Sequence, residues 1–182
     1  MRSTVVHVET LEPDLTRIEM GRWKPPPPKS SPYITPEGYE ALQADLKALW
    51  ARRADVVKAL SAAAAEGDRS ENAEYIYRKK ELGGIDYRIR YLQKRLPNLN
   101  IVRETPQSDR VHFGAWVTVE RDDGSHVEYR IVGADEADAA NGLISIDSPL
   151  ARALLGKSPG DEIELKLADR RELLSIDRVR YD

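Results

Sequence analysis

The sequence predicts an α+β fold in which an antiparallel coiled-coil hairpin of two α-helices precedes a small domain built around a sheet. Two long stretches carry apolar residues at alternating steps of three and four, which is the spacing of a coiled-coil seam. A compact polar segment over residues 67–75 separates them. Beyond Pro97 the pattern changes to short runs of alternating apolar and polar residues, typical of β-strands. We therefore expect an N-terminal extension over 1–32, the hairpin over 33–97 and the second domain over 98–182.

The N-terminal extension is poorly patterned. It ends in a proline-rich linker with four consecutive prolines, Pro25 to Pro28, which favour an extended polyproline II spacer. The residues before them either form a short strand, Val5 to Val8, or are disordered. We assign the extension no function.

The first helix is predicted to begin with Thr35 as N-cap, Pro36 at the first helical position and Glu37 in the first turn. Its seam consists of Tyr39, Leu42, Leu46, Leu49, Val56, Leu60 and Ala63, with Arg53 in the polar position. A helix from Pro36 to Glu66 would be ~45 Å long at ~1.5 Å per residue. Gly67 is the expected C-cap.

The second helix is predicted to start with Asp68 or Ser70 as N-cap and to end at Pro97. Its seam consists of Tyr75, Leu82, Ile85, Ile89, Leu92 and Leu96, with Arg78 in the polar position. Neither helix can bury its seam alone, so the two fold back on each other. The pair Gly83 and Gly84 costs roughly 1 kcal/mol per glycine in a helix, which predicts a bend or a close contact there.

The last domain is predicted to contain five strands and one helix. Strands over 116–120 and 127–132 flank a turn at 122–125, and a third covers 143–147. Ser148 caps a short helix over 150–155 that Gly156 closes. Strands over 161–167 and 172–179 follow. The domain shows no nucleophile and base pair, glycine-rich phosphate loop or histidine cluster, so it is interpreted as a docking module.

Composition excludes several classes of function. The chain has 182 residues, a formal net charge of -3 and no cysteine, which excludes disulfides, thiol catalysis and cysteine-bound metals. Its three histidines are scattered, without metal-ligand spacing. No apolar run approaches the ~20 residues of a membrane span, so the expected location is the cytoplasm, with no membrane partner.

Two acids in the polar segment are candidate metal ligands. Asp68 and Glu71 lie three residues apart at a helix start, close enough to face the same way. They are either a solvated helix cap or ligands of a hard cation such as Mg²⁺, which prefers oxygen. Two carboxylates make a weak site, so a partner would have to supply further ligands.

The hairpin is rich in basic residues, and their role has two interpretations. They form either a solvated helix surface or a stripe that contacts phosphates of RNA or DNA. The candidates are Arg52, Arg53, Lys58, Arg78, Lys79, Lys80, Arg88 and Arg90. Four tyrosines lie among them, Tyr75, Tyr77, Tyr87 and Tyr91; they could stack on bases, but most are expected to fill or flank the seam.

Several separate motifs, in the right order, resemble the bacterial Gre transcript cleavage factors. In the hairpin these are Ile34 to Tyr39, Gly67 to Tyr75, Lys79 and Lys80, and Arg90 to Leu92. In the last domain they are Phe113 to Val117, Arg130 to Gly133 and Ile144 to Leu155. The resemblance spans roughly 34–167, and the tip motif Asp68 to Asn72 and the stretch Phe113 to Trp116 resemble the GreB branch.

The resemblance implies a coiled-coil hairpin, an FKBP-like last domain and a role in transcription elongation. In that family the last domain docks at the rim of the secondary channel of RNA polymerase, and the hairpin reaches the active centre of a backtracked enzyme. By this resemblance Asp68 and Glu71 help to hold a Mg²⁺ shared with the polymerase, and none is bound stably by the free protein. Arg69, Ser70 and Asn72 support them near the 3′ end of the nascent RNA. The matching docking residues are Asp147, Ser148, Pro149, Leu150 and Arg152.

The leading prediction is therefore a monomer that stimulates the polymerase's own cleavage of backtracked RNA and is not an enzyme alone, with a contact to DNA as a further expectation. One alternative is a secondary-channel inhibitor without cleavage activity, which the acids at the tip disfavour. Another is an FKBP-like isomerase or chaperone, which rests on fold analogy alone.

Overall fold

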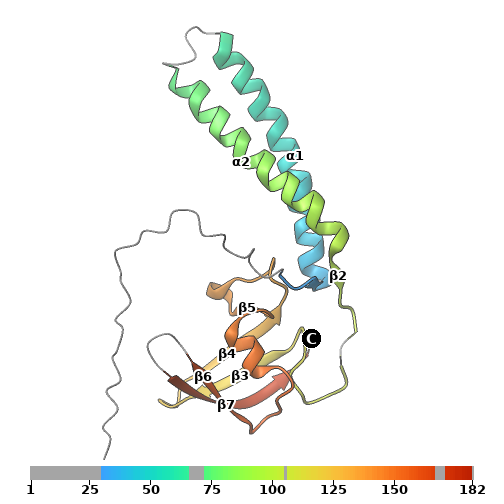
Figure 1. Cartoon of the computed structure of the whole chain (residues 1–182), viewed down its shortest axis with the longest axis vertical. Coiled ribbons are helices and arrows are strands. Elements are labelled where there is room, and N and C mark those ends of the chain that lie inside the picture. The colour runs from blue at the N-terminus through green and yellow to red at the C-terminus, as the bar shows by residue number, and fades with distance from the viewer. Residues whose placement is uncertain (1–29, 66–71, 105, 167–170, 182) are drawn as a thin grey trace, which may run out of the picture.

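A computed structural model of the chain describes residues 30–65, 72–104, 106–166 and 171–181. A long helical hairpin stands on a small sheet domain, and only the base of the hairpin lies near that domain (Figure 1). The predicted α+β architecture is confirmed. The strand and proline-rich linker predicted for the N-terminal extension lie outside the described residues.

The hairpin consists of α1, Pro36–Ala65, and α2, Ala73–Arg95, which lie side by side and run in opposite directions (Figure 1). Each predicted seam contributes three buried residues to the helices, Leu42, Val56 and Ala63 on α1 and Ile85, Ile89 and Leu92 on α2. The chain leaves α2 through a 3₁₀ turn, η1, Leu96–Asn98, which contains Pro97. Because proline has no amide donor, α2 ends just before Pro97, as predicted.

Of the two features expected at Gly83 and Gly84, a bend or a close contact, the close contact is wrong for the described residues. Both glycines are exposed within the continuous helix α2. A Cβ added to either would meet nothing within 4 Å among the described residues. Packing within the described chain therefore gives no reason for the pair.

A short sheet that the sequence did not predict closes the base of the hairpin. Strand β1, Tyr33–Ile34, pairs in parallel with β2, Asn100–Ile101, so the chain entering α1 is tied to the chain leaving η1. Ile34 is fully buried and packs in an apolar cluster with Leu42 and Leu92. Two-residue strands have too little alternation to be recognised from the pattern.

The sheet domain has five strands in the order β5-β4-β3-β7-β6. They are β3, Trp116–Arg121; β4, His126–Val132; β5, Leu143–Ser145; β6, Glu162–Lys166; and β7, Arg171–Arg180. Within this five-stranded sheet β4 and β5 pair in parallel, and the other described pairs are antiparallel. A 3₁₀ turn, η2, Ala139–Asn141, precedes β5. All five predicted strands are present.

One face of this sheet forms the core of the domain. Val117, Val119 and Ile131 are fully buried, and helix α3, Pro149–Leu154, adds Ala151 and Leu154 to the same cluster. Ser148 caps α3 as predicted, since its Oγ accepts a hydrogen bond from the Ala151 amide at 3.2 Å. Among the described residues, no helix has the length and apolar character needed to cross a bilayer.

Candidate functional site at the hairpin tip and base

Asn72 joins the two helices at the far end of the hairpin. Its Oδ1 accepts from the amide of Tyr75 at 3.1 Å, and its Nδ2 donates to the carbonyl of Ala63 at 2.9 Å. The first bond caps α2, and the second reaches across to the last turn of α1. One side chain thus satisfies a free amide of one helix and a free carbonyl of the other.

The N-cap of α2 is therefore Asn72, and the prediction of Asp68 or Ser70 is wrong. Helix α2 begins later than expected, at Ala73, so those two residues precede the cap. Asp68, Arg69, Ser70, Glu71 and the expected C-cap Gly67 lie outside the described residues. The described residues contain no group of three or more histidines or acids placed to hold a metal ion. A Mg²⁺ site at Asp68 and Glu71 thus stays a prediction.

Four of the predicted basic residues form ion pairs within the hairpin. Arg53 Nε lies 2.7 Å from Asp86 Oδ1 and Arg88 Nη2 lies 3.0 Å from Asp45 Oδ2, each joining one helix to the other. These two arginines fasten α1 to α2.

Glu81 accepts hydrogen bonds from the other two arginines, Arg52 and Arg78. Arg52 Nη2 lies 2.5 Å from Glu81 Oε1, and Arg78 Nη1 lies 3.0 Å from Glu81 Oε2. The hydrogen bond from Arg52 is the main reason that the pKa of Glu81 is lowered from its ordinary value of 4.5. Arg78 also pairs with Glu74, whose hydrogen bond is the main cause of its raised pKa.

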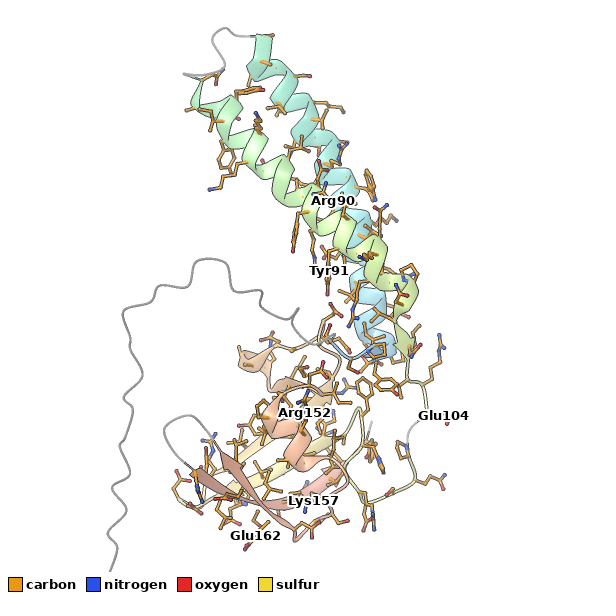
Figure 2. All side chains as sticks on the ribbon, viewed as in Figure 1. Arg90, Tyr91, Glu104, Arg152, Lys157 and Glu162 are labelled. Atoms are coloured by element: carbon orange, nitrogen blue, oxygen red, sulfur yellow. The ribbon has the colours of Figure 1, made fainter. Side chains whose placement is uncertain are left out.

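The other four basic residues are exposed. They are Lys58, Lys79, Lys80 and Arg90, and none forms an ion pair with another part of the chain that the structure describes. Figure 2 labels Arg90 on α2. These four are the members of the predicted set whose charge is free for a partner.

The tyrosines of α2 divide into two groups. Tyr77 and Tyr87 are 60% and 69% exposed, so the expectation that most tyrosines serve the seam does not hold for them. Tyr75 is half-buried, as expected of a seam residue. Tyr91 lies lower on the hairpin and donates a hydrogen bond from its hydroxyl to Asp135 Oδ1.

The base of the hairpin is fastened to the sheet domain by two acids in the loop after β4. Glu136 Oε1 accepts from the amide of Thr35 at 3.0 Å and from that of Gly133 at 2.9 Å, and Glu136 Oε2 accepts from the Thr35 hydroxyl. Thr35 is the N-cap of α1, as predicted, since its Oγ1 accepts from the Gly38 amide at 3.0 Å. Glu136 thus binds the start of the arm.

Gly38 leaves room for this carboxylate. A Cβ at Gly38 would lie 2.0 Å from Glu136 Oε2, closer than two atoms can approach without bonding. The absence of a side chain at Gly38 therefore leaves the space in which Glu136 contacts the start of α1.

Asp135 fastens the end of the arm in the same way. Its Oδ2 accepts from Arg95 Nε at 2.8 Å, and its side chain is only 8% exposed. Burial, followed by the hydrogen bond to Asp135, raises the pKa of Tyr91. Sequence reasoning missed both Asp135 and Glu136, because two acids in a polar loop carry no distinctive local pattern.

The predicted docking residues lie at the start of α3. Asp147 Oδ2 accepts from the amide of Ser31 at 2.8 Å, Ser148 caps the helix and Leu150 packs against the core. Pro149 and Arg152 are exposed, and Figure 2 labels Arg152 on α3. A role for these residues in docking stays a prediction.

Comparisons with known proteins cover both parts of the molecule. The family model described as "Transcription elongation factor, N-terminal" matches residues 32–101, and the one described as "Transcription elongation factor, GreA/GreB, C-term" matches residues 106–181. The chain belongs to the GreA/GreB family of transcription elongation factors. The two matches correspond to the hairpin with its short basal sheet and to the sheet domain.

Curated relatives place the chain on the GreB side of the family. It is 52% identical over 164 residues to transcription elongation factor GreB of Pseudomonas aeruginosa, covering 89% of this chain and 98% of that protein. It is 54% identical over 165 residues to GreB of Xanthomonas axonopodis pv. citri, with the same coverage of both chains. The resemblance found in the sequence is confirmed, and the chain is a GreB-like transcription elongation factor.

Solved structures are more distant. The Gfh1 protein of Thermus thermophilus is 24% identical, with 81% of this chain and 97% of that chain covered, and its TM-score is 0.38. A GreA/GreB factor from Nitrosomonas europaea is 22% identical, with 83% and 100% covered and a TM-score of 0.37. TM-scores this low do not establish a shared fold, and the FKBP-like character of the sheet domain stays a prediction.

Proposed function

We propose that this elongation factor binds RNA polymerase, inserts its hairpin through the secondary channel and stimulates cleavage of the 3′ end of backtracked RNA. The supporting observation is that the segment with Asp68 and Glu71 joins the far ends of two long, ion-paired helices. A 30-residue helix such as α1 spans ~45 Å at ~1.5 Å per residue. That length separates the tip from the domain that would dock.

The chemistry of the proposed tip site follows from its donors. Carboxylate oxygens are suitable ligands for Mg²⁺, but two of them leave most of an octahedral shell unfilled. Polymerase carboxylates would supply the rest, so the free chain would bind no metal stably. An ion held there would supply the orientation and activation of the water that attacks the phosphodiester. Asp68 and Glu71 would help to hold the ion in place while the water attacks, and the hydrolytic activity would be that of the polymerase.

The base of the hairpin supports this proposal by linking the arm to the docking domain. Glu136 binds the first residue before α1, and Asp135 binds the last residue of α2. Both helices of the arm are therefore bound to the loop that follows β4. Exposed Lys58, Lys79, Lys80 and Arg90 are the proposed contacts to RNA or to the polymerase along the arm, because their charge is not used within the described chain.

The test is RNA release from a purified, deliberately backtracked elongation complex. We expect Asp68→Ala and Glu71→Ala each to reduce stimulated cleavage at least about a hundredfold, since a metal ligand at the reacting centre is lost, while polymerase affinity changes little. Glu40→Ala is the matched control, because Glu40 is an exposed acid near the base of the same hairpin. Equal losses of binding and cleavage would refute the metal-holding role, and inhibition without cleavage would favour a channel-blocking factor.

A further inference from the structure

The outer surface of α2 combines features that a solvated helix rarely needs. Six residues, here called the tyrosine-glycine face, lie on the side of α2 away from the buried seam, in two runs with steps of three: Tyr77, Lys80 and Gly83, then Gly84, Tyr87 and Arg90. All six are exposed. None of the six is acidic, so the face carries two positive charges.

The two glycines lie between Tyr77 and Tyr87 along α2 and leave its surface bare there. Nothing in the described chain lies within 4 Å of a Cβ added at either position. A surface hollow of about 360 Å³ lies beside Gly84 and is lined by Tyr77, Lys80, Glu81 and Gly84. The acid at its rim, Glu81, is already paired with Arg52 and Arg78. The negative charge of Glu81 is thus already engaged within the hairpin.

Helix physics makes this arrangement unfavourable for the isolated chain. Glycine is the poorest helix former apart from proline, and two in succession weaken the middle of an arm whose proposed task requires length. Exposed tyrosines beside an open stretch of backbone are instead typical of protein interfaces, where tyrosine and arginine are enriched. The backbone at the glycines can then be approached more closely than a side chain would allow.

We propose that the tyrosine-glycine face is a contact surface for RNA polymerase, and that it receives an acidic protein ridge of the polymerase between Tyr77 and Tyr87. The inference rests on the proposed function and adds the surface of the arm that meets the channel wall. Charge complementarity selects an acidic ridge. Two cations over a face ~20 Å long, at ~1.5 Å per residue, are a sparse match for a nucleic-acid strand, whose every nucleotide carries a phosphate.

Substitution of the glycines gives the sharpest test, because stability and binding should change in opposite directions. In the full chain, Gly83→Ala with Gly84→Ala should raise the melting temperature of the hairpin, followed by circular dichroism, since both side chains enter open space. The same variant should bind core RNA polymerase about tenfold more weakly, because the added methyl groups cover the surface left bare at the glycines. Tyr77→Ala with Tyr87→Ala should weaken binding by at least as much.

Two substitutions on α1 are the controls. Ser61→Ala is an exposed change that also favours helix, and Trp50→Ala removes an aromatic ring that is 47% exposed. Both should leave polymerase affinity unchanged. If the wild-type chain binds polymerase and the glycine and tyrosine variants bind equally well, the proposed face is wrong while the proposed function survives.

Two other outcomes also decide the matter. If the variants lose affinity for a single-stranded RNA oligonucleotide and keep that for polymerase, the face contacts nucleic acid and the protein ridge is refuted. If the wild-type chain does not bind polymerase at all, both this inference and the proposed function fail.

Discussion

At the scale of single residues, Asn72 shows how one side chain can shape the end of the arm. An aspartate at this position would accept from the Tyr75 amide equally well, but it could not donate to the carbonyl of Ala63. The amide group is therefore matched to a position between two helix ends. Its two bonds hold together the two helix ends that the segment with Asp68 and Glu71 connects.

Two substitutions at Asn72 separate its roles. Asn72→Ala should lower the free energy of unfolding of the hairpin by about 1 kcal/mol through loss of the cap. Asn72→Asp should keep the cap and lose only the bond to Ala63, so its stability should lie closer to the wild type. Thermal melts of the full chain measure both effects. Equal destabilisation by the two variants would show that the bond between the helices, and not the cap, dominates.

At the scale of the helix pair, the arm is held by an apolar seam flanked by ion pairs. Arg53 and Arg88 each join one helix to the other, and Glu81 joins Arg52 on α1 to Arg78 on α2. Exposed ion pairs contribute little singly, because solvent screens them and long side chains must be ordered. Because each pair between the helices joins one particular residue of α1 to one of α2, together they favour one register of the two helices.

The Glu81 cluster predicts a dependence of hairpin stability on pH. The pKa of Glu81 in the folded chain lies below its ordinary value of 4.5. Its ionised form therefore stabilises the fold above pH 4.5, and this contribution disappears as the pH falls through the folded-state pKa. Glu81→Gln should be less stable than the wild type at pH 7, and the difference should close on acidification. A constant difference across that range would refute the ionic contribution.

At the scale of the whole molecule, a single loop connects the arm to the sheet domain. Glu136 binds the start of α1, Asp135 binds the end of α2, and Gly38 leaves space for the first of these carboxylates. The direction of the arm relative to the sheet domain is therefore set where the two domains touch. A small change at this junction is magnified along the length of the hairpin.

The contact between Gly38 and Glu136 predicts that Gly38→Ala changes stability in opposite directions with and without the Glu136 side chain. Gly38→Ala alone should destabilise the chain and reduce stimulated cleavage, because the new Cβ displaces the Glu136 carboxylate. In a Glu136→Ala background the same change should stabilise the chain by up to about 1 kcal/mol, because alanine favours helix and the clash is gone. A double-mutant cycle of thermal stability measures this coupling, and additive effects would show that the carboxylate moves aside freely.

The sequence by itself determined the two long helices, the five strands and the cap of α3, because each depends on periodicity or turn chemistry within a short stretch. It also carried the family, through motifs that remain recognisable one by one. Only the tertiary structure decided which arginines are committed to ion pairs, which tyrosines face solvent and that Asn72 joins the two helices. Only the structure could likewise show the contact between the hairpin and the sheet domain, since Thr35 and Glu136 are 101 residues apart in the chain. The physical reason is that a carboxylate in a loop has the same local sequence whether it meets water or a distant helix, and only the folded chain selects its partner.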